Sequence, residues 1–190
     1  MEPLNIGFAL CGSFCTFSQV IPQLEALAKE GHNVFPIMSE NAGTLDTRFG
    51  RAADHAARIE AACGRRVIAT LPEAEPIGPK KLLDVLIIEP CTGNTLAKLA
   101  HGVADTPVTL AAKSHLRNAR PLVIAVSTND GLAGAAENIG RLHNRKHVFF
   151  VPYRQDDCEQ KPTSLVADFT RTRDAMLLAL EGRQLQPMLL

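Results

Sequence analysis

The stretch VLIIEPCTGNT, Val85 to Thr95, decides how this sequence folds. Four consecutive apolar residues lead into a loop of small and hydroxyl-bearing residues, and an amphipathic segment follows. A run that is apolar at every position, rather than at alternate positions, is typical of a strand buried on both faces of a sheet. The same order of apolar run, small loop and amphipathic segment recurs along the chain, which predicts a parallel sheet covered by helices.

Six apolar runs are expected to form strands, and amphipathic segments between them are expected to form helices. The predicted fold is α/β, with a six-stranded, mainly parallel sheet. The predicted strands are Ile6 to Leu10, Val34 to Ile37, Val67 to Ala69, Val85 to Ile88, Leu122 to Val126 and Val148 to Val151. The predicted helices cover about 20–28, 46–63, 94–101, 106–117 and 132–142.

A length of 190 residues suits one domain with a sizeable core. We therefore expect a single domain over 1–190, with its core at about 4–152. The polar stretch after Pro152 is expected to be a surface loop, followed by a long C-terminal helix at about 163–181. The apolar tail at 184–190 is expected to be a flexible end or to pack on a neighbouring subunit.

Charge and cysteine usage narrow the class of partner. Twenty basic and twenty acidic residues give a formal net charge of zero, so a field that would attract nucleic acid or an anionic membrane is missing. No apolar run approaches the roughly 20 residues of a membrane span, and the N-terminus lacks a basic signal-peptide start. Five cysteines without a CxxC pair indicate reduced thiols and no metal site. We expect a cytoplasmic protein with a small-molecule or protein partner.

Three small-residue loops follow the first, second and fourth predicted strands, where ligands of parallel sheets bind. The first contains Gly12, Ser13 and Phe14 at the start of a helix, which favours an anion such as phosphate. The second contains Ser39 and Asn41. Plain capping turns explain both loops about equally well. There is no GxGxxG and no GK[ST], so the chain itself gives weak support for NAD binding.

The third loop, Pro90 to Thr95, is the most specific of the three. Its small residues leave room for a flat ring, and Asn94 offers both a donor and an acceptor. A turn that only capped a helix would not need this set of residues.

The run Pro90-Cys91-Thr92-Gly93-Asn94-Thr95 and the helix that follows it, to Asp105, resemble the PASANT motif and helix of the homo-oligomeric flavin-containing cysteine decarboxylase family. Gly12-Ser13 resembles that family's glycine-serine turn, and Ser39 lies where the family has a phosphate-binding hydroxyl. The resemblance spans about Ile6 to Pro152. Within this superfamily, ALCGSFCTF, PCTGNTLAKLAHGVADTPVTLAAKSHLRN and STNDGLAGAAENIGRLHNRKHVFFVPYRQDD are similar to the family of dipicolinate synthase B subunits of endospore-forming bacteria.

This resemblance implies a single flavoprotein-like domain over 1–190 with a Rossmann-like three-layer αβα fold. It also implies an oxidoreductase subunit that helps to oxidise dihydrodipicolinate, a small dicarboxylate, to dipicolinate during sporulation. It implies FMN on this chain, an A subunit that carries NAD(P), and a homo-oligomer such as a trimer or dodecamer. The alternative is a non-catalytic partner with a vestigial flavin cleft, the A subunit carrying the chemistry. The residues expected at the cofactor are Gly12, Ser13, Phe14, Ser39, Asn41, Pro90, Cys91, Thr92, Gly93, Asn94, Thr95 and Asn129.

Departures from the family pattern leave the catalytic residues unidentified. The decarboxylases have a histidine before the strand that leads into PASANT, but Glu75 to Lys80 contains none, which argues against cysteine decarboxylation. Val126 to Gly131 replaces the family's PxMN segment, so the substrate differs. Three groups of residues have both a functional and a structural interpretation. Cys11, Cys15 and Cys91 are a redox site or core thiols, and His101 is a catalytic residue or a helix cap. The bases bind a dicarboxylate or are isolated surface charges, and they are Lys80, Lys81, Lys113, Arg117 and Arg120.

Overall fold

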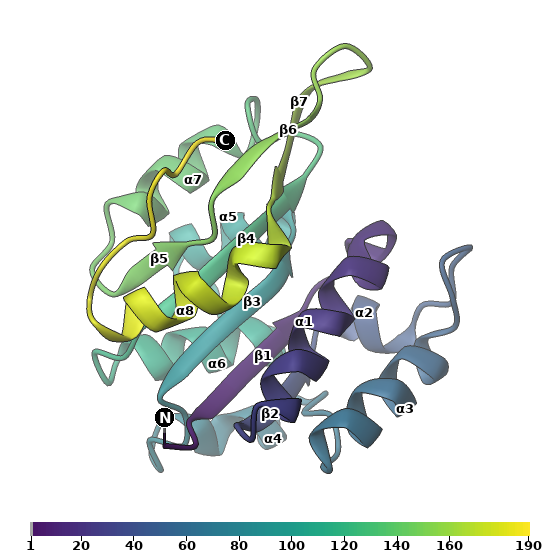
Figure 1. The fold of residues 1–190 in the computed structure, drawn as a ribbon, viewed down its shortest axis with the longest axis vertical. Helices are drawn as coiled ribbons and strands as arrows, with labels where there is room; N and C mark the ends of the chain where they lie inside the picture. Colours follow the sequence, from purple (N-terminus) through teal and green to yellow (C-terminus); the bar gives the residue numbers. More distant parts are fainter. Residues whose placement is uncertain (1) are drawn as a thin grey trace.

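A computed structural model describes residues 2–190 of the chain. Its central sheet has the strand order β2-β1-β3-β4-β7-β6, and β5 also pairs with β4 (Figure 1). Strands β1 to β5 are parallel, whereas β7 is antiparallel to β4 and to β6. The strands are β1 (Asn5–Leu10), β2 (Asn33–Met38), β3 (Val85–Cys91), β4 (Leu122–Thr128), β5 (Val148–Phe150), β6 (Tyr153–Asp157) and β7 (Lys161–Ala167).

Helices cover both faces of this sheet. Helices α1 and α8 pack together on one face, and α6 packs on the other beside α5. Figure 1 shows α1 and α8 in front of the sheet and α5, α6 and α7 behind it. The helices are η1 (Phe14–Thr16), α1 (Phe17–Lys29), α2 (Glu40–Thr44), α3 (Ala52–Cys63), α4 (Leu71–Ala74), η2 (Glu75–Ile77), α5 (Gly93–His101), α6 (Pro107–Leu116), α7 (Ala136–His143), η3 (Phe169–Arg171) and α8 (Thr172–Leu180).

The predicted three-layer α/β class is confirmed, with seven strands in place of six. Strands β1, β3 and β4 are apolar at consecutive positions because both of their faces are covered, and nearly all their side chains are buried. The predicted helix pair is also present. The first helix of the pair ends at Gly102, whose backbone conformation is left-handed. The second begins with a capping box between Thr106 and Thr109.

The predicted strand Val67 to Ala69 is wrong. This segment forms only an isolated bridge, Ile68 with Ile37. It lies between Gly64, which ends α3, and Thr70, whose capping box begins α4. The segment therefore pairs with β2 at one position only and does not add a strand to the sheet.

The predictions for the chain after Pro152 are also wrong. Residues 153–167 form the β6–β7 hairpin instead of a loop, and the helix expected from about 163 begins only at Thr172. Leu165 and Ala167 are buried, in the alternate pattern of a strand. The C-terminal tail packs on its own chain, since the Tyr153 N–H bonds the Met188 carbonyl and the Leu190 N–H bonds the Tyr153 carbonyl.

No helix within residues 2–190 is long and apolar enough to cross a membrane.

Candidate functional site

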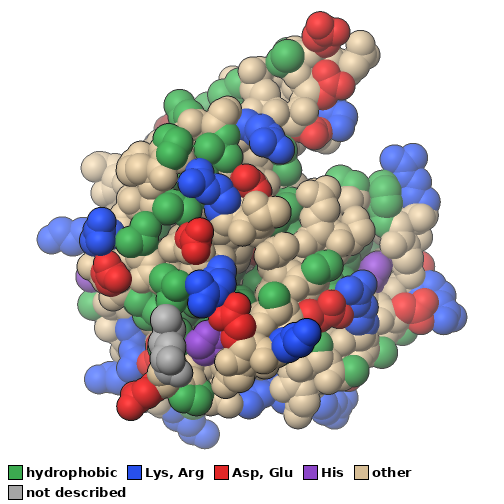
Figure 2. Space-filling model, in the orientation of Figure 1, with side chains coloured by type: hydrophobic (Ala, Val, Ile, Leu, Met, Phe, Trp, Pro, Cys, Tyr) green, Lys and Arg blue, Asp and Glu red, His purple; other side chains and the backbone are tan. Residues whose placement is uncertain are grey.

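A cleft opens at the carboxyl ends of β1, β3 and β4, where parallel sheets bind ligands. Its volume is about 960 Å³, which is the size of a site for a small organic molecule. Figure 2 shows the hollow between the protruding hairpin and the body of the molecule. The lining comes from the β1–α1 turn, the ends of β3 and β4, the hairpin and η3.

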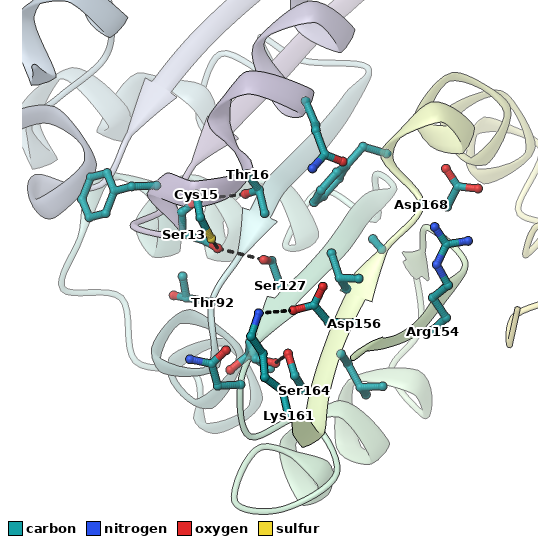
Figure 3. Close-up of a pocket in the computed structure, with 18 of the residues that line it drawn as sticks. Ser13, Cys15, Thr16, Thr92, Ser127, Arg154, Asp156, Lys161, Ser164 and Asp168 are labelled. Carbon is teal, nitrogen blue, oxygen red and sulfur yellow. Dashed lines mark hydrogen bonds and ion pairs between the residues drawn. The ribbon is translucent and has the colours of Figure 1, made fainter. Parts of the chain in front are cut away.

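Hydroxyl groups from separate strands meet at this cleft (Figure 3). The Ser13 Oγ, after β1, lies 2.8 Å from the Ser127 Oγ at the end of β4. Thr92, after β3, also lines the cleft, with its Oγ1 3.2 Å from that of Thr95. The β3–β4 register shifts between Ile88 and Cys91, so the ladder is irregular just before the loop begins. These hydroxyls can donate to or accept from a polar ligand.

Two helix beginnings have free backbone N–H groups, one at the cleft and one next to the cleft residue Thr92. Neither Phe14 nor Cys15, at the start of η1, has an N–H partner within residues 2–190. The same holds within these residues for the N–H groups at the start of α5, from Gly93 to Thr95, because Thr92 does not cap the helix with its side chain. Such N–H groups, together with the helix dipole, attract an anion. The donor set therefore fits a phosphate group such as that of FMN.

The β6–β7 hairpin forms the opposite wall of the cleft. Side chains alternate along β6, so Arg154 and Asp156 face the cleft, joined by Ser164 from β7. The Lys161 Nζ lies 2.7 Å from the Asp156 Oδ2 (Figure 3). Arg154 makes no ion pair among residues 2–190, so its charge is available to an anionic ligand.

Five of the expected cofactor residues line the cleft. They are Gly12, Ser13, Phe14, Thr92 and Asn129. Their contact with a cofactor stays a prediction, but the fold brings them to one rim, as the rule for parallel sheets requires.

Other expected cofactor residues lie outside the cleft lining. The Ser39 Oγ accepts the Ala42 N–H at 3.3 Å and so caps α2, which is the structural alternative that the sequence offered. The exposed Asn41 lies beside the Gly12 turn, and Asn94 is exposed on α5.

The remaining residues of the third loop pack inward. Pro90 is buried, and its carbonyl accepts the Cys11 N–H at 3.2 Å. Thr95 is buried and donates to the Cys11 Sγ at 3.2 Å. Burial raises the pKa of Cys11 to about 11 and that of Cys91 well above its ordinary value. Cys11 and Cys91 are therefore neutral core thiols at physiological pH, whereas Cys15 is exposed at the cleft.

Gly93 is required by a close approach of two loops. A Cβ at this position would lie 2.7 Å from the Thr128 Oγ1 and 2.8 Å from the Asp130 Oδ1. The glycine therefore lets the start of α5 pack against the end of β4. The small residues of this loop were expected to leave room for a flat ring, but the environment of Gly93 is this packed contact.

Two of the residues weighed in the sequence, His101 and Arg120, have structural contacts. The His101 Nδ1 lies 2.9 Å from the Ala97 carbonyl oxygen, within its own helix. Arg120 pairs with Asp84 and bonds the Lys81 carbonyl. No histidine lines the cleft among residues 2–190, and this range contains no cluster of three or more metal-ligating side chains.

The hairpin residues Arg154, Asp156, Lys161 and Ser164 were missed as site residues from the sequence, because the polar pattern of 153–163 is that of a surface loop. The sequence offered no clear strand signal here, because Leu165, Val166 and Ala167 are apolar at consecutive positions and do not alternate with polar residues. Ser127 was missed as well, although it directly follows a predicted strand.

The fold and the cleft together define an αβα protein with a cleft for a small molecule at the carboxyl ends of its strands. A comparison with protein families agrees, because the Flavoprotein family model matches residues 1–173. The chain belongs to the flavoprotein family.

Similar proteins make the resemblance more specific. The dipicolinate synthase B subunit of Bacillus subtilis (strain 168) is 44% identical over 185 residues, 97% of this chain and 92% of that protein. The crystal structure of the dipicolinate synthase B subunit from Bacillus halodurans matches with a TM-score of 0.90 and 39% identity, covering 98% of this chain and 96% of that chain. The resemblance predicted from the loop sequences is confirmed.

The fold also extends to more distant structures. A dodecameric FMN-dependent UbiX-like decarboxylase from Escherichia coli O157:H7 matches with a TM-score of 0.64 and 24% identity, covering 78% of this chain and 80% of that chain. At this identity the likeness concerns the fold alone.

Proposed function

We propose that this chain is the B subunit of a dipicolinate synthase and takes part in oxidising dihydrodipicolinate to dipicolinate during sporulation. The 44% identity to a dipicolinate synthase B subunit along nearly the whole chain is the observation that carries this proposal. The proposal includes a single cytoplasmic domain, a homo-oligomer and an A subunit that carries NAD(P). The dodecameric relative supports the homo-oligomer by analogy only.

We assign FMN to the cleft. Its phosphate would be held by the free N–H groups of η1 and α5, and the Ser13 and Thr92 hydroxyls would bond its polar atoms. Oxidation of the dihydropyridine ring removes a hydride and a proton, and FMN, when bound, supplies the hydride acceptor. The chain's own contribution is to hold and orient both molecules.

Arg154 gives the cleft a cation for the substrate. Dihydrodipicolinate carries two carboxylates, and a guanidinium binds a carboxylate through two parallel N–H donors. Lys161 is less available because Asp156 already pairs with it. We therefore assign one substrate carboxylate to Arg154, which lies across the cleft from the Ser13 turn (Figure 3).

The alternative function is a non-catalytic partner whose flavin cleft is vestigial. The observation in its favour is that Ser39, Asn41 and Asn94 do not line the cleft. In that case the A subunit and its nicotinamide perform the oxidation, and this chain contributes contacts to that subunit.

Purified full-length protein separates the two functions. We expect visible flavin absorbance and FMN binding that weakens in Ser13→Ala. The matched control, Ser18→Ala, changes an exposed hydroxyl on α1 outside the cleft and should bind FMN as the wild type does. We also expect Arg154→Gln to raise the KM for dihydrodipicolinate while leaving FMN affinity unchanged.

A colourless protein without FMN affinity, active only with the A subunit and a nicotinamide, would establish the alternative. A chain that neither binds FMN nor stimulates pyridine formation with the A subunit would refute both functions.

A further inference from the structure

A second cavity lies at the other end of the sheet from the cleft. Its volume is about 610 Å³, and it lies beside His147, whose carbonyl accepts the Leu122 N–H at the beginning of β4. The lining comes from the second half of α6, the α5–α6 connection and the segment before β5. We call it the basic pocket, and its residues are Ala104, Leu110, Lys113, Ser114, Leu116, Arg117, Arg145, Lys146 and His147.

The charge of this pocket stands out in a chain with zero formal net charge. Four of its lining residues are cations, and none of the lining residues is acidic. Within residues 2–190, none of these four makes an ion pair. Acidic groups on nearby segments already have partners, because Asp105 pairs with Lys98 and Asp84 with Arg120.

The negative ends of three helices offset part of this positive charge. Lys113 is in the last turn of α6, Arg145 donates to the Leu99 carbonyl near the end of α5, and α7 ends just before Arg145. Each helix end carries about −0.5 elementary charge, so three of them offset about 1.5 of the four positive charges. About two to three positive charges remain, which is the charge that a dianion neutralises.

The shape of the pocket favours a small organic anion over a bare ion. Leu110 and Leu116 are half-buried and give it an apolar wall, and the Ser114 hydroxyl adds a polar group. Lys113 and Arg117 are one helical turn apart, where two like charges repel each other unless an anion lies between them. A flat, apolar body with two anionic groups fits both the wall and the charge.

We propose that the basic pocket is a binding site for a small organic dianion, separate from the cleft. Two carboxylates or one phosphate provide the same charge, so the recognised chemistry is an apolar body with two negative charges. The site is independent of the function assigned to the cleft.

Calorimetric titration of the full chain tests this site with two probes, pyridine-2,6-dicarboxylate and phenyl phosphate. We expect at least one of them to bind, about tenfold more weakly in the double variant Lys113→Gln/Arg117→Gln and about threefold more weakly in Lys146→Gln. The double variant Lys29→Gln/Arg66→Gln removes two charges outside the pocket and should stay within about twofold of the wild type. Which probe binds more tightly decides between carboxylate and phosphate.

Mapping the position of the bound probe distinguishes the basic pocket from the cleft. We expect the probe to slow hydrogen exchange at 110–117 and 145–148, and this protection should persist in Arg154→Gln. Charge-conserving Lys113→Arg/Arg117→Lys should retain binding, and an unchanged thermal midpoint in each variant excludes unfolding. The proposal is overturned if neither probe binds, if Lys113→Gln/Arg117→Gln binds as the wild type does, or if a glutamate-rich peptide binds and both small probes do not.

Discussion

Glu89 gives the structure a pH dependence that can be worked out in advance. It is fully buried in β3, its Oε2 accepts from the Thr172 Oγ1 of α8, and its Oε1 has no partner within residues 2–190. Burial raises the pKa of this carboxyl from 4.5 to about 8, and the Thr172 hydrogen bond opposes this only in part. The folded protein therefore holds the proton at pH 7, whereas the unfolded chain releases it.

The sign and size follow from proton linkage. With the pKa raised in the folded state, the stabilisation from the bound proton is complete below pH 4.5 and is lost as the pH rises toward about 8. Each pH unit in this window costs about 1.4 kcal/mol of the free energy of unfolding. Burial lowers the pKa of His115 to about 4 and also lowers that of His143, and these groups act in the opposite direction below pH 6.5. The effect of Glu89 on the free energy of unfolding is therefore clearest from pH 6.5 to 8, above the range in which these histidines act.

We expect Glu89→Gln to remove this loss. The free energy of unfolding of the wild type should fall by about 2 kcal/mol more than that of the variant between pH 6.5 and 8. Denaturant titration at several pH values measures this difference. The control Glu75→Gln, at an exposed site, should follow the wild-type pH dependence. Parallel pH curves for the wild type and Glu89→Gln would refute the burial argument.

Three further substitutions test the loops at the rim of the sheet. Gly93→Ala should lower the free energy of unfolding by about 1–3 kcal/mol, because the new Cβ overlaps Thr128 and Asp130; a neutral effect in denaturant titration would contradict this packing. Ser39→Ala should lower it by about 1 kcal/mol through loss of the α2 cap, and FMN affinity should fall only if Ser39 also contacts the phosphate. Asn94→Asp should weaken FMN binding in a fluorescence titration by placing a negative charge at the start of α5, with little change in the thermal midpoint; wild-type affinity would argue against phosphate binding there.

The central part of the fold could be predicted from the sequence because its signals are local. Buried strands such as β3 are apolar at every position, and the ends of α5 and α6 carry Gly102 and Thr106, whose conformations end and begin helices. The β6–β7 hairpin could not be predicted in this way. Its β7 pairs with Ser127 and Thr128 of β4, far away in sequence, while the spacing of Leu165, Phe169 and Met176 imitates a helix.

The candidate site also has one part that the sequence predicts and one part that it does not. The turns after β1 and β3 were predictable, because a parallel sheet brings the carboxyl ends of its strands to one edge. The opposite wall depends on where the hairpin folds back, and no local pattern near Arg154 indicates this. Half of the cleft is therefore a product of tertiary structure, including the cation that we assign to the substrate.

Ser39 and Thr92 both follow a buried strand and precede a helix, but they differ in whether they cap that helix. The sequence already favoured the loop of Thr92 as the more specific of the two, and it left Ser39 open as either a phosphate ligand or a helix cap. In the structure the Ser39 Oγ accepts an N–H of its own helix, whereas the Thr92 Oγ1 lies next to Thr95 and leaves the first N–H groups of α5 free. An unmade cap forgoes about 1 kcal/mol, and an anion bound to those N–H groups would recover that free energy. The free N–H groups at the start of α5 therefore indicate a phosphate position more strongly than the hydroxyl after β2 does.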